Sequence, residues 1–122
     1  MWPSCSLSIG LDASLLSHDP GVVEAYRRDP LVHNRMSAQT YCAILRVYDD
    51  ALQRAPTLRV PTLLLYGTDD HIVSIEMATR WFSLLTCEKR AVAFPGAYHE
   101  LHHEPIREEA LRLVCDWVRR GS

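Results

Sequence analysis

The stretch that most constrains the fold runs from Val60 to His71, where an uncharged, mostly apolar segment meets two carboxylates. Its first part, VPTLLLYG, carries no charged side chain, and Asp69 and Asp70 follow shortly after its glycine. Apolar runs of this length are typical of strands buried on both faces of a parallel sheet. In α/β proteins the chemistry gathers at the carboxyl ends of such strands. The stretch therefore predicts a buried strand over 60–66 that ends beside a functional site.

A second stretch, from Arg90 to His99, repeats this pattern. Its apolar run over 90–94 breaks at a Pro-Gly pair, and the histidine follows shortly afterwards. Between the two predicted strands lies one amphipathic segment over 76–86, with Ser74 as its candidate N-cap. A strand, a helix and a second strand in this order make a right-handed βαβ unit with parallel strands. The side chains of Asp70 and His99 are then expected at the same edge of the sheet.

Three further helices are predicted outside this unit. One spans 20–28, with Asp19 as N-cap and proline in its first turn, one spans 37–54, with Ser37 as N-cap, and the last begins around Pro105. Residues 1–18 show no clear periodicity and are expected to form a loop. The apolar positions expected to face a core recur at helical spacing: Tyr41, Ile44, Leu45, Tyr48 and Leu52; Met77, Trp81 and Leu84 or Leu85; Ile106, Ala110, Leu113, Val114 and Trp117.

The predicted fold class is α/β, a short parallel sheet of two core strands packed with helices. At 122 residues the chain is one domain at most. A sheet covered by helices usually has four or more strands, so the domain is expected to be incomplete. The net charge of −2 gives no argument for binding nucleic acid, and no apolar run is long enough for a transmembrane helix.

The four cysteines are far apart in the sequence and show no CxxC spacing. They are Cys5, Cys42, Cys87 and Cys115. Cysteines without a framework or metal-binding spacing are typical of free thiols in a reducing compartment. A cytoplasmic location is therefore predicted.

Asp70 and His99 are the candidate catalytic residues. An aspartate that accepts a hydrogen bond from one imidazole nitrogen fixes the tautomer and stabilises the imidazolium. The other nitrogen can then act as a general base toward a nucleophile or water. Asp69 competes for the orienting role, and it could equally be a turn residue whose side chain bonds its own backbone. His18 has no partner that the sequence identifies and is expected to be solvated.

His99 to His103 also fit H-E-x-x-H, a signature of zinc proteases. That chemistry needs both histidines one helical turn apart, whereas Pro105 disfavours helical geometry at Glu104. The helix is therefore expected to begin after the motif, and no third ligand stands downstream. No metal and no cofactor are predicted. A weak metal site formed by His99, His102 and His103 is the alternative.

Two segments resemble the α/β-hydrolase family. Residues 61–73, PTLLLYGTDDHIV, are similar to the segment that carries the family's catalytic acid, and residues 94–104, FPGAYHELHHE, to the segment that carries its catalytic histidine. The order Gly-x-Tyr-His-Glu-Leu-His-x-Glu resembles the monoacylglycerol lipase and lysophospholipase branch. Residues 15–20 and 26–33 resemble that branch's cap region, and the likeness covers nearly all of 10–120.

This resemblance implies Asp70 as the acid and His99 as the base of a Ser-His-Asp triad, and it places Asp69 outside the triad. It implies the C-terminal part of an α/β-hydrolase fold. Residues 1–36 would be a remnant of the cap, or lid, with loops, and residues 37–122 a segment of the core. The His-Glu-Leu-His order is common in this branch without zinc.

The resemblance also shows what the sequence lacks. In the family the order is Ser, Asp, His, with the serine on a G-x-S-x-G elbow before the cap. The segment around Ser8, SLSIG, lacks the first glycine and a preceding strand. The implied protein is a C-terminal fragment of a serine hydrolase of lipid metabolism that acts on acyl esters such as monoacylglycerols. Triad members act as a unit, so the chain alone is expected to be nearly inert.

A second hypothesis is a non-catalytic interaction module. The strand over 60–66 would have one unpaired edge, and an exposed apolar edge pairs readily with another chain. The expected partner is a complementary N-terminal half of the hydrolase or a second copy of this chain. A zinc hydrolase built on H-E-x-x-H is the third hypothesis.

Overall fold

A two-stranded parallel sheet forms the centre of the computed structural model, which describes residues 6–8 and 10–120. The strands and helices in chain order are β1 (Ser6–Ser8), α1 (Pro20–Arg28), β2 (Arg35–Ser37), α2 (Ala38–Arg54), β3 (Thr62–Gly67), α3 (Ile75–Leu84), β4 (Lys89–Phe94) and α4 (Arg107–Arg120). Single 3₁₀ turns lie at Ala13–Leu15, Ala55–Thr57 and Leu101–His103. The predicted α/β fold with two parallel core strands is confirmed.

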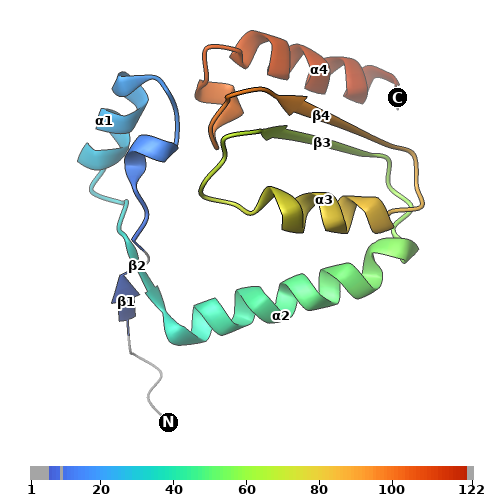
Figure 1. Ribbon diagram of the computed structural model, residues 1–122, viewed down its shortest axis with the longest axis horizontal. Coiled ribbons are helices and arrows are strands. Elements are labelled where there is room, and N and C mark those ends of the chain that lie inside the picture. The colour runs from blue at the N-terminus through green and yellow to red at the C-terminus, as the bar shows by residue number, and fades with distance from the viewer. Residues whose placement is uncertain (1–5, 9, 121–122) are drawn as a thin grey trace.

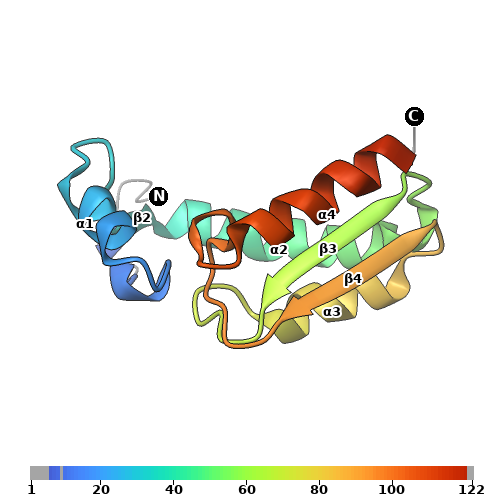
Figure 2. The same ribbon diagram turned by 90° about the horizontal axis from the view of Figure 1, so that it is seen from above.

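The sheet lies between helices on both faces. β3 and β4 are in parallel register, with Thr62 opposite Lys89 and Gly67 opposite Phe94. Figure 1 shows α4 on one face and α3, followed by α2, on the other, and Figure 2 shows the same layers from above. The α4 face holds the principal apolar cluster, formed by Phe94, Ala97 and Ala110 with Leu65, Val92, Leu101, Ile106 and Leu113 packed against them.

The N-terminal segment forms a separate small lobe beside the carboxyl ends of β3 and β4 (Figures 1 and 2). Its centre is an apolar cluster of Ala13, Leu16 and Val23, and Ile72 from the loop after β3 packs against it. β1 and β2 pair antiparallel in this lobe. The prediction of a loop over 1–18 is therefore wrong at Ser6–Ser8, because a three-residue strand is set by its distant partner and leaves no readable alternation.

Three predicted helix starts are confirmed by their caps. The side chain of Asp19 accepts the backbone N–H of Gly21 before α1. Ser37 and Ser74 accept backbone N–H groups in the same way before α2 and α3. These polar residues compete poorly for helix interiors but satisfy the free N–H groups of a first turn, so they mark helix starts reliably.

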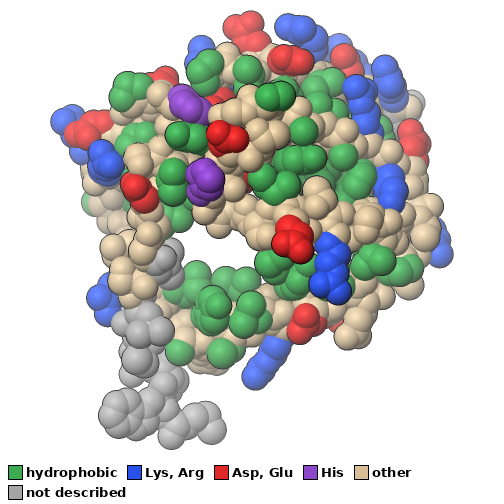
Figure 3. Space-filling model, viewed as in Figure 1, with side chains coloured by type: hydrophobic (Ala, Val, Ile, Leu, Met, Phe, Trp, Pro, Cys, Tyr) green, Lys and Arg blue, Asp and Glu red, His purple; other side chains and the backbone are tan. Residues whose placement is uncertain are grey.

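The predicted burial of α2 is wrong. None of its residues is buried, and Tyr41, Ile44 and Leu45 are 45–57% exposed. Figure 3 shows hydrophobic side chains gathered along α2, beside an opening in the molecule. Helical spacing indicates that one face is apolar. The C-terminal half of this face packs beside α3, where Tyr48 and Leu52 are partly buried, but its N-terminal half is left exposed in the described part of the chain.

Two smaller predictions of burial also differ from the structure. Met77 in α3 is 37% exposed and Val114 in α4 is 41% exposed, whereas Leu85, the C-cap of α3, and Ala110 in α4 are buried. α4 begins at Arg107, two residues after the expected start. The chain first makes a turn, in which the backbone N–H of Arg107 donates a hydrogen bond to Glu104 C=O.

None of the helices in the described part of the chain has the length and hydropathy needed to cross a membrane. Cys42, Cys87 and Cys115 are free thiols, and Cys5 lies outside the described residues.

Candidate active site

Asp70 lies in the turn that follows β3, at the carboxyl edge of the sheet. Its Oδ1 accepts the backbone N–H groups of Ile72 and Val73 at 2.9 and 3.0 Å. These two bonds fix the carboxylate, whose other oxygen, Oδ2, lies 2.9 Å from Nδ1 of His99. Because an ionised carboxylate only accepts hydrogen bonds, Nδ1 of His99 carries the proton in this pair.

His99 follows β4 through a tight turn. Gly96 adopts a φ of +72°, which favours glycine, and its N–H donates to the Thr68 hydroxyl at 2.8 Å. The N–H of Asp69 donates to Ala97 C=O, so the turns after the two strands are bonded to each other. This cross-linking explains why two residues 29 positions apart meet.

The environments of the two side chains differ. The Asp70 side chain is 10% exposed and the His99 side chain 34% exposed. Burial alone raises the pKa of Asp70, but the hydrogen bond from His99 and those from the Val73 and Ile72 backbone outweigh it, so the pKa of Asp70 lies below its ordinary value. The aspartate thus stays charged, and Nε2 of His99 makes no hydrogen bond within the described part of the chain.

Asp69 is not part of this pair. It is exposed and accepts a hydrogen bond from the Thr68 hydroxyl at 3.1 Å. Of the two aspartates that the sequence offered as partners for His99, the structure brings Asp70 to the imidazole.

Glu104 is a second ordered carboxylate that the sequence analysis missed. Glu104 is 1% exposed, and its two carboxylate oxygens accept hydrogen bonds from His18 and Tyr98. The expectation that His18 is solvated is therefore wrong in part: its ring is bonded to Glu104 and stacks on Tyr98 with 3.7 Å between ring centroids. No local sequence signal marks this pair, because its members are 86 residues apart.

The H-E-x-x-H segment does not form the helix that a zinc-protease site needs. Leu101–His103 is a single 3₁₀ turn, and Nδ1 of His99 is bonded to Asp70. The alternative metal group also differs from the expected one, since Glu100, His102 and His103 bring their ligand atoms within 4.8 Å of one another without His99. Glu100 and His103 already form a hydrogen bond of 2.7 Å in this cluster.

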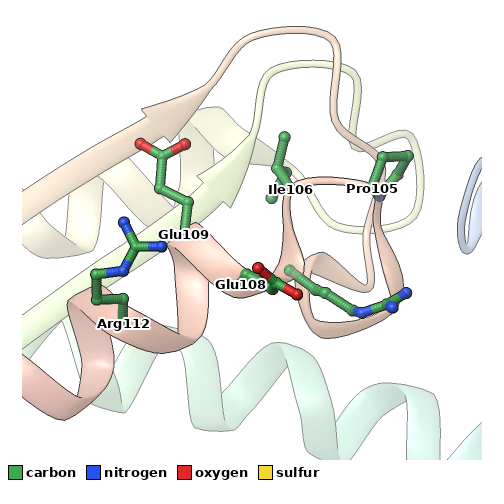
Figure 4. Close-up of a pocket in the computed structure, with 6 residues that line it drawn as sticks. Pro105, Ile106, Glu108, Glu109 and Arg112 are labelled. Carbon is green, nitrogen blue, oxygen red and sulfur yellow. The ribbon is translucent and has the colours of Figure 1, made fainter.

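Three of the surface hollows in the described part of the chain lie beside α2 and α3, beside α1, and at the start of α4. An apolar groove of about 430 Å³ runs between α2 and α3 and is lined by Ile44, Tyr48, Ala51, Val73, Ser74, Met77, Ala78 and Trp81. A hollow of about 420 Å³ lies between α1 and the turn that contains Glu100 and His103. The third, of about 470 Å³, lies at the start of α4, where Figure 4 shows Glu109 and Arg112 on the same side of the helix. Asp70 and His99 line none of the three.

Acidification is expected to remove the stability that Glu104 contributes. Burial alone raises the pKa of Glu104, but the hydrogen bonds from His18, with smaller contributions from Ser17 and the Tyr98 backbone, together outweigh this and hold the pKa below the ordinary value of 4.5. A lowered pKa in the folded state stabilises the protein above the unfolded-state value, and this contribution is lost as the pH falls through the folded-state value. The melting temperature of Glu104→Gln should therefore lie well below that of the wild type at pH 7 and approach it as the pH falls below the lowered pKa of Glu104.

Thermal unfolding followed by circular dichroism from pH 7 down into the acid range checks this, with the partly buried Glu100→Gln as the control. A gap between wild type and Glu104→Gln that stays constant with pH would contradict the assignment.

Comparison with known proteins places this chain in a family. The Hydrolase_4 family, described as serine aminopeptidase S33, matches residues 1–106. The chain is 32% identical to monoacylglycerol lipase of Mycolicibacterium smegmatis over 88% of this chain and 39% of that protein. It is 30% identical to phospholipase YtpA of Bacillus subtilis over 92% of this chain and 44% of that protein.

Solved structures agree with the sequence relatives. The monoacylglycerol lipase of Paleococcus ferrophilus superposes with a TM-score of 0.83 at 37% identity, covering 98% of this chain and 48% of that one. A monoglyceride lipase of Saccharomyces cerevisiae shares the fold, with a TM-score of 0.84 at 16% identity over 98% of this chain and 45% of that one. The chain spans less than half the length of each of these relatives. The chain thus belongs to the serine aminopeptidase S33 family of α/β hydrolases, in its monoacylglycerol lipase-like branch.

Proposed function

We propose that this chain supplies the acid, Asp70, and the base, His99, of a Ser-His-Asp triad that hydrolyses carboxylic esters of fatty acids. The observation that carries the proposal is the 2.9 Å hydrogen bond between the two side chains at the carboxyl edge of the sheet. The relatives named monoacylglycerol lipase and phospholipase support acyl glycerols and phospholipids as the substrate class.

In this mechanism Nε2 of His99 takes the proton from a serine hydroxyl as the serine attacks the ester carbonyl. Asp70 stabilises the imidazolium that forms and keeps the ring in the Nδ1–H tautomer. The imidazolium then returns the proton to the leaving alcohol, and a water molecule, activated by the same nitrogen, releases the fatty acid from the acyl-enzyme. Nε2 is suited to this role because its ring is partly exposed while Nδ1 is held.

The serine is proposed to come from outside these 122 residues, on the same polypeptide or on a complementary chain. The hydrogen bonds of the described residues link no serine to His99. On this proposal residues 1–36 are part of the cap and residues 37–122 part of the core, in keeping with their separate apolar clusters. A cytoplasmic location is also proposed, because the three described cysteines are free thiols.

The test is labelling by a fluorophosphonate probe, read by intact mass. The probe reacts with a serine that a nearby base activates. The chain is assayed alone and mixed with the N-terminal segment of the Paleococcus ferrophilus lipase, the relative with 37% identity. We expect no adduct on the chain alone and one adduct on the partner segment in the mixture, which His99→Ala abolishes. An adduct on the 122-residue chain itself that His99→Ala removes would show that this chain holds its own nucleophile.

A second candidate function is a non-catalytic interaction module. The observations that favour it are the exposed apolar face of α2 and the unpaired edge of β3, which pairs with β4 alone among the described strands. Both features are typical of surfaces that another chain covers. The proposed partner is a complementary N-terminal half of the hydrolase or a second copy of this chain.

This surface predicts concentration-dependent self-association. Leu45 is 45% exposed in the middle of the apolar face, so Leu45→Glu should shift the chain toward monomer without a loss of melting temperature. Size-exclusion chromatography with light scattering at low micromolar concentration measures this, with the exposed polar Gln53 changed to Glu as the control. A wild-type chain that elutes as a clean monomer would argue against the module.

A further inference from the structure

Among the described residues, Glu104 is the one charged side chain that the fold buries, with 1% of its surface exposed. Burying a carboxylate is costly unless several donors meet it. Three do so here: the backbone N–H of His18 donates to Oε1 at 2.7 Å, and Nδ1 of His18 and the backbone N–H of Tyr98 donate to Oε2 at 2.7 and 3.3 Å. A neutral amide at this position would turn a donor toward at least one of them.

These donors come from two segments that flank the proposed base. Tyr98 directly precedes His99, and His18 directly precedes the N-cap of α1. The two segments also meet through the backbone, since the N–H of Glu100 donates to Leu16 C=O at 2.9 Å and the Ser17 hydroxyl donates to His103 C=O at 2.9 Å. Glu104 therefore joins the proposed cap segment to the loop that carries His99.

We infer that Glu104 is a positioning residue for His99, acting through the backbone of Tyr98 and through His18. His99 is then held at two places. Asp70 holds its ring, and Glu104 holds the backbone of Tyr98, the residue directly before it. The His18 ring, which is bonded to Glu104, also stacks on Tyr98 at an interplanar angle of 23° and so links the same two residues a second time. The consequence is that the orientation of Nε2 depends on whether the segment before α1 is docked on the loop.

This inference rests on the proposed function, and nuclear magnetic resonance of the ¹⁵N-histidine-labelled 122-residue chain tests it. At pH 8 the His99 ring of the wild type is expected in the Nδ1–H tautomer, paired with Asp70. Glu104→Gln should increase the Nε2–H tautomer of His99 several-fold, and hydrogen exchange of the Tyr98 amide should speed up about tenfold. His18→Ala should shift the tautomer in the same direction.

Glu100→Gln is the matched control, because Glu100 also bonds a histidine in this loop but is more exposed and does not contact the N–H of Tyr98. It should leave His99 unchanged. Because a buried carboxylate with only a structural role would lower the melting temperature without moving the tautomer, an unchanged His99 in both Glu104→Gln and His18→Ala overturns the inference. His18→Ala decides alone if Glu104→Gln does not fold, since the His18 side chain is 45% exposed. A wild-type His99 outside the Nδ1–H tautomer would instead overturn the proposed function.

Discussion

Replacing Asp70 by asparagine is expected to slow fluorophosphonate labelling in the mixture with the N-terminal lipase segment by roughly 10³- to 10⁴-fold. The asparagine Oδ1 can still accept the N–H groups of Ile72 and Val73, so the turn is expected to survive. The atom that faces Nδ1 of His99 becomes an amide donor. The ring must then turn or adopt the Nε2–H tautomer, which cannot accept the serine proton.

Asp69→Asn is the matched control, because it makes the same change one residue away. Asp69 is exposed and bonded to Thr68, so its replacement should change the labelling rate less than about twofold. The labelling rates of both variants are measured by intact mass over time, after circular dichroism has shown that both fold. An equal loss of labelling rate in the two variants would mean that the conformation of the loop after β3, and not the Asp70 carboxylate, determines the reactivity of the serine.

The proximity of Asp70 and His99 could be predicted because it depends on local signals. Each apolar run ends at a glycine, and parallel strands joined by one helix place their carboxyl ends at the same edge. The helix starts at Asp19, Ser37 and Ser74 were equally readable, since a cap acts on its own first turn. The catalytic roles of the pair stay a prediction.

The parts that could not be predicted depend on partners far away in the sequence. In the sequence, Glu104 is an acidic residue before a proline, and acidic residues are seldom buried. Its contact with His18 therefore has no local sequence signal. Likewise, the spacing of α2 shows an apolar face but not what covers it, and the pairing of β1 with β2 links segments about thirty residues apart.

Gly67 should be the position least tolerant of a methyl group. It ends β3 opposite Phe94, and a Cβ built there would lie 2.1 Å from Ala97 O and 2.6 Å from Tyr98 O. Both neighbours are backbone atoms, which cannot move aside as a flexible side chain can. Gly67→Ala is therefore expected to destabilise the fold by about 3 kcal/mol and to lower the melting temperature by on the order of 10 °C.

The same methyl group should also disturb the proposed site. Ala97 and Tyr98 lead directly into His99, so a displaced peptide moves the imidazole away from Asp70, whose own turn begins at Gly67. Gly21→Ala in α1 is the control, because its new Cβ would meet a side-chain oxygen of Asp19 at 3.1 Å and no backbone. Thermal unfolding and fluorophosphonate labelling of the mixture check both variants. If Gly67→Ala were as stable as Gly21→Ala, the turns after β3 and β4 would not be in contact. The arrangement proposed to bring Asp70 and His99 together would then be wrong.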